Sequence, residues 1–154
     1  MMSADPLETN ALQKQLAQLL GTNREELSNQ YQRVLRESLF LNRGEVRPNM
    51  IKGIASDEVE TFLDFLQQPG FSGAERGAQL YKTGLGEQVV LRLGWVMRQF
   101  FLSYLENGQV APMLELVDAY QEAVIQGYIK CLEKDIFTEQ ERTFKALQRA
   151  ILGP

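Results

Sequence analysis

The sequence predicts an all-α domain of about six helices with a long C-terminal helix. Leucine occurs 22 times and glutamine 15 times, against 15 valines and isoleucines together. Leucine and glutamine are good helix formers, whereas β-branched residues lose side-chain freedom in a helix. No stretch of four or more residues clearly alternates between apolar and polar side chains, so no half-buried strand is predicted.

Proline and glycine residues delimit four helices in the first part of the chain. Pro6 and Pro48 suit the first turn of a helix, and Gly21 and Gly70 follow the predicted ends. Apolar residues recur three or four positions apart inside each segment, which is the spacing of a helix with one buried face. The four helices are predicted over residues 6–20, 23–41, 48–68 and 72–82.

Two longer helices are predicted in the second part. Residues 87–106 are apolar on several faces, which is typical of a central helix or of a subunit contact. The last helix begins near Ala111-Pro112. Its final part has a heptad-like seam, and we favour one continuous helix over a break and restart at Thr138. The seam consists of Phe137, Gln140, Phe144, Leu147 and Ile151.

Glycines inside predicted helices need a packing reason, because each costs about 1 kcal/mol relative to alanine. Gly94 and Gly127 lie midway along the two longest helices. We therefore expect these two helices to cross closely at these positions, with a tolerated kink as the alternative.

Six helices in a chain of 154 residues favour a globin-like or bundle-like domain. We expect this domain to cover residues 1–136, with residues 137–154 as a helical linker or a continuation of the last helix. The chain ends abruptly after the seam, so we expect an output domain to follow.

The composition argues against several functions. The chain has no histidine, which is the usual haem and zinc ligand and the commonest general base. Its single cysteine, Cys131, is expected to be a small buried residue in a reducing compartment. The net charge of −4, without a basic segment, argues against binding of nucleic acid or a membrane. We expect a cytoplasmic protein with no cofactor, no metal and no catalytic activity.

The order of helices, the segment VVLRLGWVMRQFF and the terminal segment TEQERTFKALQRAI carry a family resemblance. The chain resembles the non-haem globin-like N-terminal sensor domains of RsbR-type stressosome proteins, related to domains that precede STAS or histidine-kinase modules. This resemblance implies a haem-free helical dimer that senses a signal and relays it to a signalling module. It covers most of the chain.

The last helix has more apolar residues than one small core requires, so we expect homodimerisation through the two C-terminal helices. The predicted interface consists of Val117, Val124, Tyr128 and Leu132. The alternative is that the terminal segment folds back on its own domain or frays.

A second hypothesis is a carrier that binds an amphipathic anion such as a fatty acid. Guanidinium groups bind carboxylates in pairs of hydrogen bonds, and aromatic rings could line an apolar pocket. The residues predicted for this site are Arg92, Trp95, Arg98 and Phe100. We favour the simpler interpretation, in which the arginines extend to water and Trp95 fills the core.

Carboxylates form two clusters, which we expect to be solvated acidic faces. They consist of Glu58, Glu60 and Asp64, and of Glu115, Asp118 and Glu122. Facing carboxylates can hold a divalent metal or act as an acid and a base, which is the alternative.

Overall fold

The computed structural model describes residues 6–68 and 70–153, and over these residues it contains helices and no strand. This confirms the all-helical class, with six α-helices and a long last helix. The α-helices are α1 (Pro6–Thr22), α2 (Arg24–Glu37), α3 (Ile51–Gln67), α4 (Ala74–Thr83), α5 (Glu87–Leu102) and α6 (Asn107–Leu152), and the short 3₁₀ helices are η1 (Leu39–Leu41) and η2 (Pro48–Met50).

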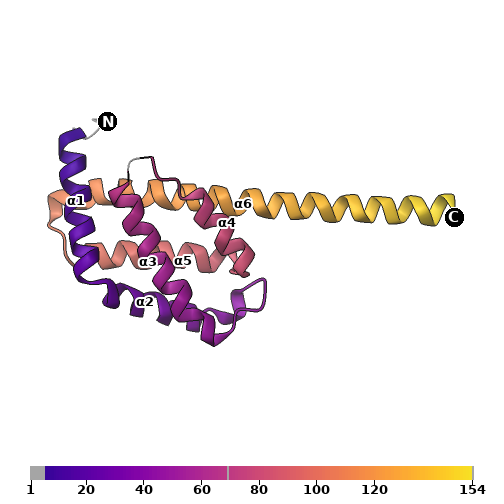
Figure 1. Cartoon of the computed structure of the whole chain (residues 1–154), viewed down its shortest axis with the longest axis horizontal. Helices are drawn as coiled ribbons and strands as arrows, with labels where there is room; N and C mark the ends of the chain where they lie inside the picture. Colours follow the sequence, from indigo (N-terminus) through magenta and orange to yellow (C-terminus); the bar gives the residue numbers. More distant parts are fainter. Residues whose placement is uncertain (1–5, 69, 154) are drawn as a thin grey trace.

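The first five helices form a body around the first half of α6 (Figure 1). α5 runs alongside α6, and α3 and α4 lie across this pair (Figure 1). The second half of α6 leaves the body and continues alone to the C-terminus (Figure 1). α6 has 46 residues and passes Phe137 without a break, as predicted.

The core is apolar and rich in aromatic side chains. Phe62 of α3 lies at its centre, with its ring centroid 4.9 Å from that of Tyr120 and 5.8 Å from that of Phe101. All three side chains are buried, so α3, α5 and α6 are joined through one aromatic cluster. Burial of a ring this size stabilises the fold by about 1.5–3 kcal/mol.

Glycines allow α4 and α6 to cross with their backbones in contact. A Cβ at Gly77 would lie 1.8 Å from the carbonyl oxygen of Val124, and one at Gly127 would lie 2.0 Å from that of Ala74. The predicted backbone crossing of the two longest helices at Gly94 and Gly127 was wrong, because the helix whose backbone meets Gly127 is α4. Gly94 of α5 instead leaves space for the side chain of Gln121 of α6.

The turn between α5 and α6 lies about four residues earlier in the chain than predicted. α5 ends at Leu102, and α6 begins at Asn107 rather than near Pro112. The Asn107-Gly108 pair was interpreted as a helix end, but it forms the first turn of α6. The side chain of Gln109 accepts a hydrogen bond from the backbone N–H of Glu106, which is part of a capping box that stabilises this start.

Candidate functional site

The most distinctive feature of the molecule is the second half of α6, which we call the arm (residues 133–153). Every residue of the arm is exposed. At 1.5 Å per residue, the arm projects about 30 Å beyond the body. An isolated helix of this length is marginally stable in water, because most helical stability comes from packing of an apolar face. Within the residues that the structure describes, the apolar side chains of the arm are thus left without packing against the body.

The arm has an apolar face that could meet a partner. Phe137, Phe144 and Ile151 follow one another at seven-residue intervals and are 62%, 61% and 80% exposed. Ile136 and Leu147 lie on the same side of the helix, at 49% and 55% exposure. From here on, the seam means these five exposed apolar residues, with Ile136 in place of the polar Gln140 of the predicted repeat. Seven-residue spacing is typical of helices that pair with another helix.

The seam continues onto the body as an apolar surface formed by α5 and α6. Leu91 and Trp95 of α5 and Ile129 of α6 are 48%, 58% and 41% exposed, and we call them the α5–α6 face. A hollow of about 280 Å³ lies between the two helices, with Leu91, Ile125 and Ile129 in its lining. Exposed apolar surfaces of this extent commonly mark a protein contact.

The body holds the base of the arm through one polar cluster. The hydroxyl of Tyr81 donates a hydrogen bond of 2.5 Å to the carboxylate of Asp135. This hydrogen bond to a negative group raises the pKa of the Tyr81 phenol. The guanidinium carbon of Arg43 lies 3.8 Å from the Tyr81 ring centroid, a cation–π contact. α4 and the loop after η1 are thus connected to the arm at Asp135.

The predicted dimer-interface residues need correction. Val117, Val124 and Tyr128 are at most 3% exposed and belong to the core of their own subunit. They face α4 and α5, so their side chains cannot contact a second copy. Leu132 is half-buried at the edge of the body, next to the exposed Ile129. The last helix is apolar along this part, as the sequence indicated, but the residues that face outward are neighbours of the predicted ones, such as Ile129.

The predicted ligand-binding residues do not converge on one pocket. Arg92 donates a hydrogen bond of 2.7 Å to the hydroxyl of Ser38, and Trp95 lies on the surface rather than in the core. Phe100 is 1% exposed, inside the core. Because these side chains point in different directions around α5, they offer no common cavity for an amphipathic anion.

The fourth member of that set, Arg98, is engaged within the chain. It donates a 2.5 Å hydrogen bond to the Asp118 carboxylate and another to the side-chain oxygen of Gln121. Gln121 is buried against Gly94, where an added Cβ would lie 2.2 Å from its amide nitrogen. Arg98 therefore ties α5 to α6 rather than waiting for a ligand.

One residue of the predicted acidic faces is buried. Glu58 accepts hydrogen bonds of 2.7 Å from the Nε of Arg76 and 2.9 Å from the hydroxyl of Tyr120. Burial, together with the charge of Glu58, holds the pKa of Tyr120 well above its ordinary value. The pKa of the buried Tyr31 is raised for the same reasons. This cluster joins α3, α4 and α6 in the core. Glu58 lies four residues before the apolar Phe62, so the two share one face of the helix, and this spacing was the sequence signal that Glu58 is buried.

The remaining carboxylates offer no metal centre. Glu60 pairs with Arg24 at 2.5 Å, and Asp118 pairs with Arg98. In residues 6–68 and 70–153, no group of three or more Asp, Glu or Cys side chains is arranged to hold a metal ion. Within the same residues, no helix combines the length and the apolar character needed to cross a bilayer.

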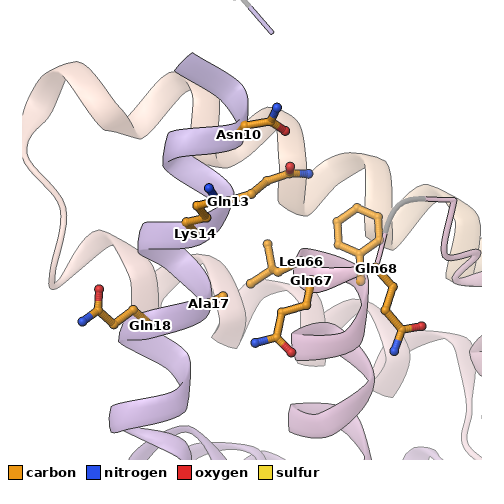
Figure 2. A pocket seen from close by; sticks show the side chains of 9 residues that line it. Asn10, Gln13, Lys14, Ala17, Gln18, Leu66, Gln67 and Gln68 are labelled. Atoms are coloured by element: carbon orange, nitrogen blue, oxygen red, sulfur yellow. The ribbon is translucent and has the colours of Figure 1, made fainter. Parts of the chain in front are cut away.

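A groove of about 600 Å³ between α1 and α3 is polar at its rim (Figure 2). Ala17 and Leu66 point toward one another across it, whereas Gln18 points away from α3 and Gln68 away from α1 (Figure 2). A ligand site requires polar groups that converge on one volume. Gln13 extends from α1 toward α3, but Gln18 and Gln68 point out of the groove, so its polar groups do not gather on one volume and the groove is not a candidate site (Figure 2).

Comparison of the chain with known protein families, with curated proteins and with solved structures finds no match. The features of the chain that bear on its function are therefore the arm, the α5–α6 face and the contacts at Asp135.

Proposed function

We propose that this chain is a haem-free regulatory or sensory input domain that pairs with a second copy and relays a signal along α6 to an output module. One observation carries the proposal: α6 is a single helix, buried in the core in its first half and exposed, with an apolar seam, in its second half. The resemblance to sensor domains of RsbR-type signalling proteins points to the same function.

The exposed apolar surface is large enough for a dimer. The seam and the α5–α6 face together contain eight exposed apolar side chains per copy. If each loses on the order of 100 Å² on pairing, two copies bury on the order of 1,600 Å². Stable interfaces typically bury about 1,200–2,000 Å². A second copy is therefore an occupant that fits the surface.

The relay follows from how the body contacts α6. α4 touches α6 backbone to backbone at Gly77 and Gly127, and touches it again where Tyr81 binds Asp135. A shift of α4 would therefore move α6 as a rigid element, and the paired arms would change their packing or rotation. Shifts of packed helices at subunit contacts are an established means of signalling.

Sedimentation analysis over a range of concentrations tests the proposal. We expect the full chain to form a dimer, and Leu147→Asp to shift it to monomer because a carboxylate would enter the seam. Thr138→Asp is the matched control, since Thr138 is exposed on the opposite side of the arm. A monomer at all concentrations would overturn the proposal. A Soret band in the purified protein would overturn its haem-free part.

A further inference from the structure

The turn between α4 and α5 (residues 84–86) is held against the loop that follows η1 (residues 42–44). The backbone N–H groups of Arg43 and Gly44 donate hydrogen bonds of 2.8 and 3.0 Å to the carbonyl oxygen of Gly84. A Cβ added at Gly84 would lie 2.9 Å from the Cα of Gly44, so the two backbones are in contact. A shift of the loop therefore shifts the turn with it.

This turn and the end of α4 contact α6 on both sides of the point where the arm begins. Before the arm, the hydroxyl of Tyr128 donates a hydrogen bond of 2.7 Å to the carbonyl oxygen of Leu85 in the turn. At the start of the arm, Asp135 accepts the hydrogen bond of Tyr81 in the last turn of α4. Tyr128 and Asp135 are seven residues apart, about 10 Å along the helix. Together the two hydrogen bonds fix the direction in which α6 leaves the body.

Asp135 provides the polar contact between the arm and the body. Among the side-chain hydrogen bonds and ion pairs in the described part of the chain, that of Asp135 is the one that joins an arm residue to another element. The other polar contacts of the arm stay within α6, as between Arg142 and Glu139. Because every residue of the arm is exposed, the base of the arm depends on this one hydrogen bond.

Tyr81 is held in place by the loop that follows η1. The guanidinium carbon of Arg43 lies 3.8 Å from the Tyr81 ring centroid, and an N–H of the same group donates a 3.4 Å hydrogen bond to the Tyr81 carbonyl oxygen. The Tyr81 ring also packs edge to face on the ring of Tyr128, with the two centroids 5.3 Å apart. The hydroxyl that Asp135 binds is thus positioned by Arg43 and Tyr128.

We infer that the loop that follows η1 controls the arm, and that Tyr81 is the residue that positions it. Such control rests on the relay proposed above and gives it a starting point in the body. A displacement of residues 42–44 takes Arg43 and the α4–α5 turn with it, moves the Tyr81 hydroxyl and releases Asp135. The first half of α6 stays packed in the core, whereas the arm becomes free to change its direction. Segments with few contacts are the ones that open locally in this way.

Hydrogen exchange of the backbone amides in the full chain tests the role of Tyr81. Tyr81→Phe removes the hydroxyl but keeps the aromatic ring. We expect exchange in residues 133–140 to become about five-fold faster or more, because the base of the arm loses a hydrogen bond to a charged group. Tyr104→Phe is the matched control, since it removes a hydroxyl that donates to the Glu26 carboxylate, in the turn at the opposite end of the body (Figure 1). Unchanged exchange in Tyr81→Phe, or the same acceleration in Tyr104→Phe, would overturn the inference.

A double variant tests whether the Tyr81 hydroxyl acts through Asp135. Asp135→Ala should accelerate exchange in residues 133–140 as much as Tyr81→Phe does. The two changes together should accelerate it no further, since both remove the same hydrogen bond. Asp135→Asn keeps an oxygen acceptor, so its exchange rate should lie between those of the natural chain and Asp135→Ala. Additive effects of Tyr81→Phe and Asp135→Ala would show that the two side chains act separately and would refute the positioning role.

Arg43→Ala tests the control by the loop. In the part of the chain that the structure describes, Arg43 forms no hydrogen bond or ion pair with the arm, so we expect its effect to pass through Tyr81. Exchange in residues 133–140 should become about two-fold faster or more in the natural background and should not change further in Tyr81→Phe. Arg47→Ala is the control, since Arg47 is an exposed arginine after the loop and pairs with Glu45. Equal acceleration by Arg43→Ala in both backgrounds would contradict control through Tyr81.

Sedimentation of the same samples separates this inference from the proposed function. A natural chain that is monomeric at all concentrations would overturn the dimer, while exchange at the base of the arm still shows whether Tyr81 positions it. A dimer whose exchange is unchanged in Tyr81→Phe would overturn the positioning role and leave the dimer in place.

Discussion

The crossing of α4 and α6 provides a prediction about stability whose magnitude follows from the structure. In Gly127→Ala, the added Cβ would lie 2.0 Å from the carbonyl oxygen of Ala74, where real Cβ contacts are at least 3.0 Å. Both atoms belong to backbone, so the two helices must separate by about 1 Å. Over-packing of this kind costs about 1–3 kcal/mol, and more where the obstacle cannot rotate away.

Alanine also favours the helix by about 1 kcal/mol relative to glycine, and this gain must be subtracted. We expect a net loss of about 2 kcal/mol or more in the free energy of unfolding. In a domain of this size, that loss lowers Tm by about 4–8 °C. Thermal unfolding followed by circular dichroism measures the change.

Gly53→Ala is the control, because the same substitution in the first turn of α3 meets nothing within 4 Å. It has the same gain in helix propensity without the clash, so we expect Tm to rise by about 2–4 °C. The difference between the two variants isolates the cost of separating α4 from α6. Equal shifts in Tm would refute the reasoning.

Three further predictions concern the core and the arm. Tyr31→Phe removes a buried hydroxyl without a hydrogen-bond partner in the described structure, so urea unfolding should show a gain of about 1 kcal/mol. Glu58→Ala leaves the buried Arg76 unpaired, and the same assay should show a loss of about 3–5 kcal/mol. The raised pKa values of Tyr31 and Tyr120 mean that the unfolded chain loses these protons first. The urea concentration at the unfolding midpoint should therefore stay constant below pH 10.0 and decrease as the pH rises above 10.0. In Tyr31→Phe, this decrease with pH should be less steep. An equally steep decrease in the variant and the natural protein would contradict the prediction.

The fold class could be predicted because composition and spacing depend on local physics. The preference for leucine and glutamine over β-branched residues indicated helices, and the seam spacing indicated that α6 continues past Phe137. Packing partners are not local. The helical position of Gly127 showed that something approaches it closely, but nothing in the spacing distinguished α4 from α5.

The candidate site was predicted less well for the same reason. Apolar residues of α6 form two neighbouring stripes, and only the packing of the body decides which one is covered. Val117, Val124 and Tyr128 are covered, and Ile129 is exposed. Trp95 was expected in the core because of its size, yet it lies outward. Arg92 and Arg98, which flank Trp95 on a neighbouring face of α5, were the sequence signal that this side of the helix is exposed.

The outward position of Trp95 has a practical consequence. It is the only tryptophan of the chain and belongs to the α5–α6 face, at 58% exposure. An indole in contact with water emits at longer wavelength than one in an apolar contact. The natural protein therefore contains its own fluorescent probe and needs no attached dye. A blue shift of the tryptophan fluorescence as the protein concentration rises would report that the α5–α6 face has become covered.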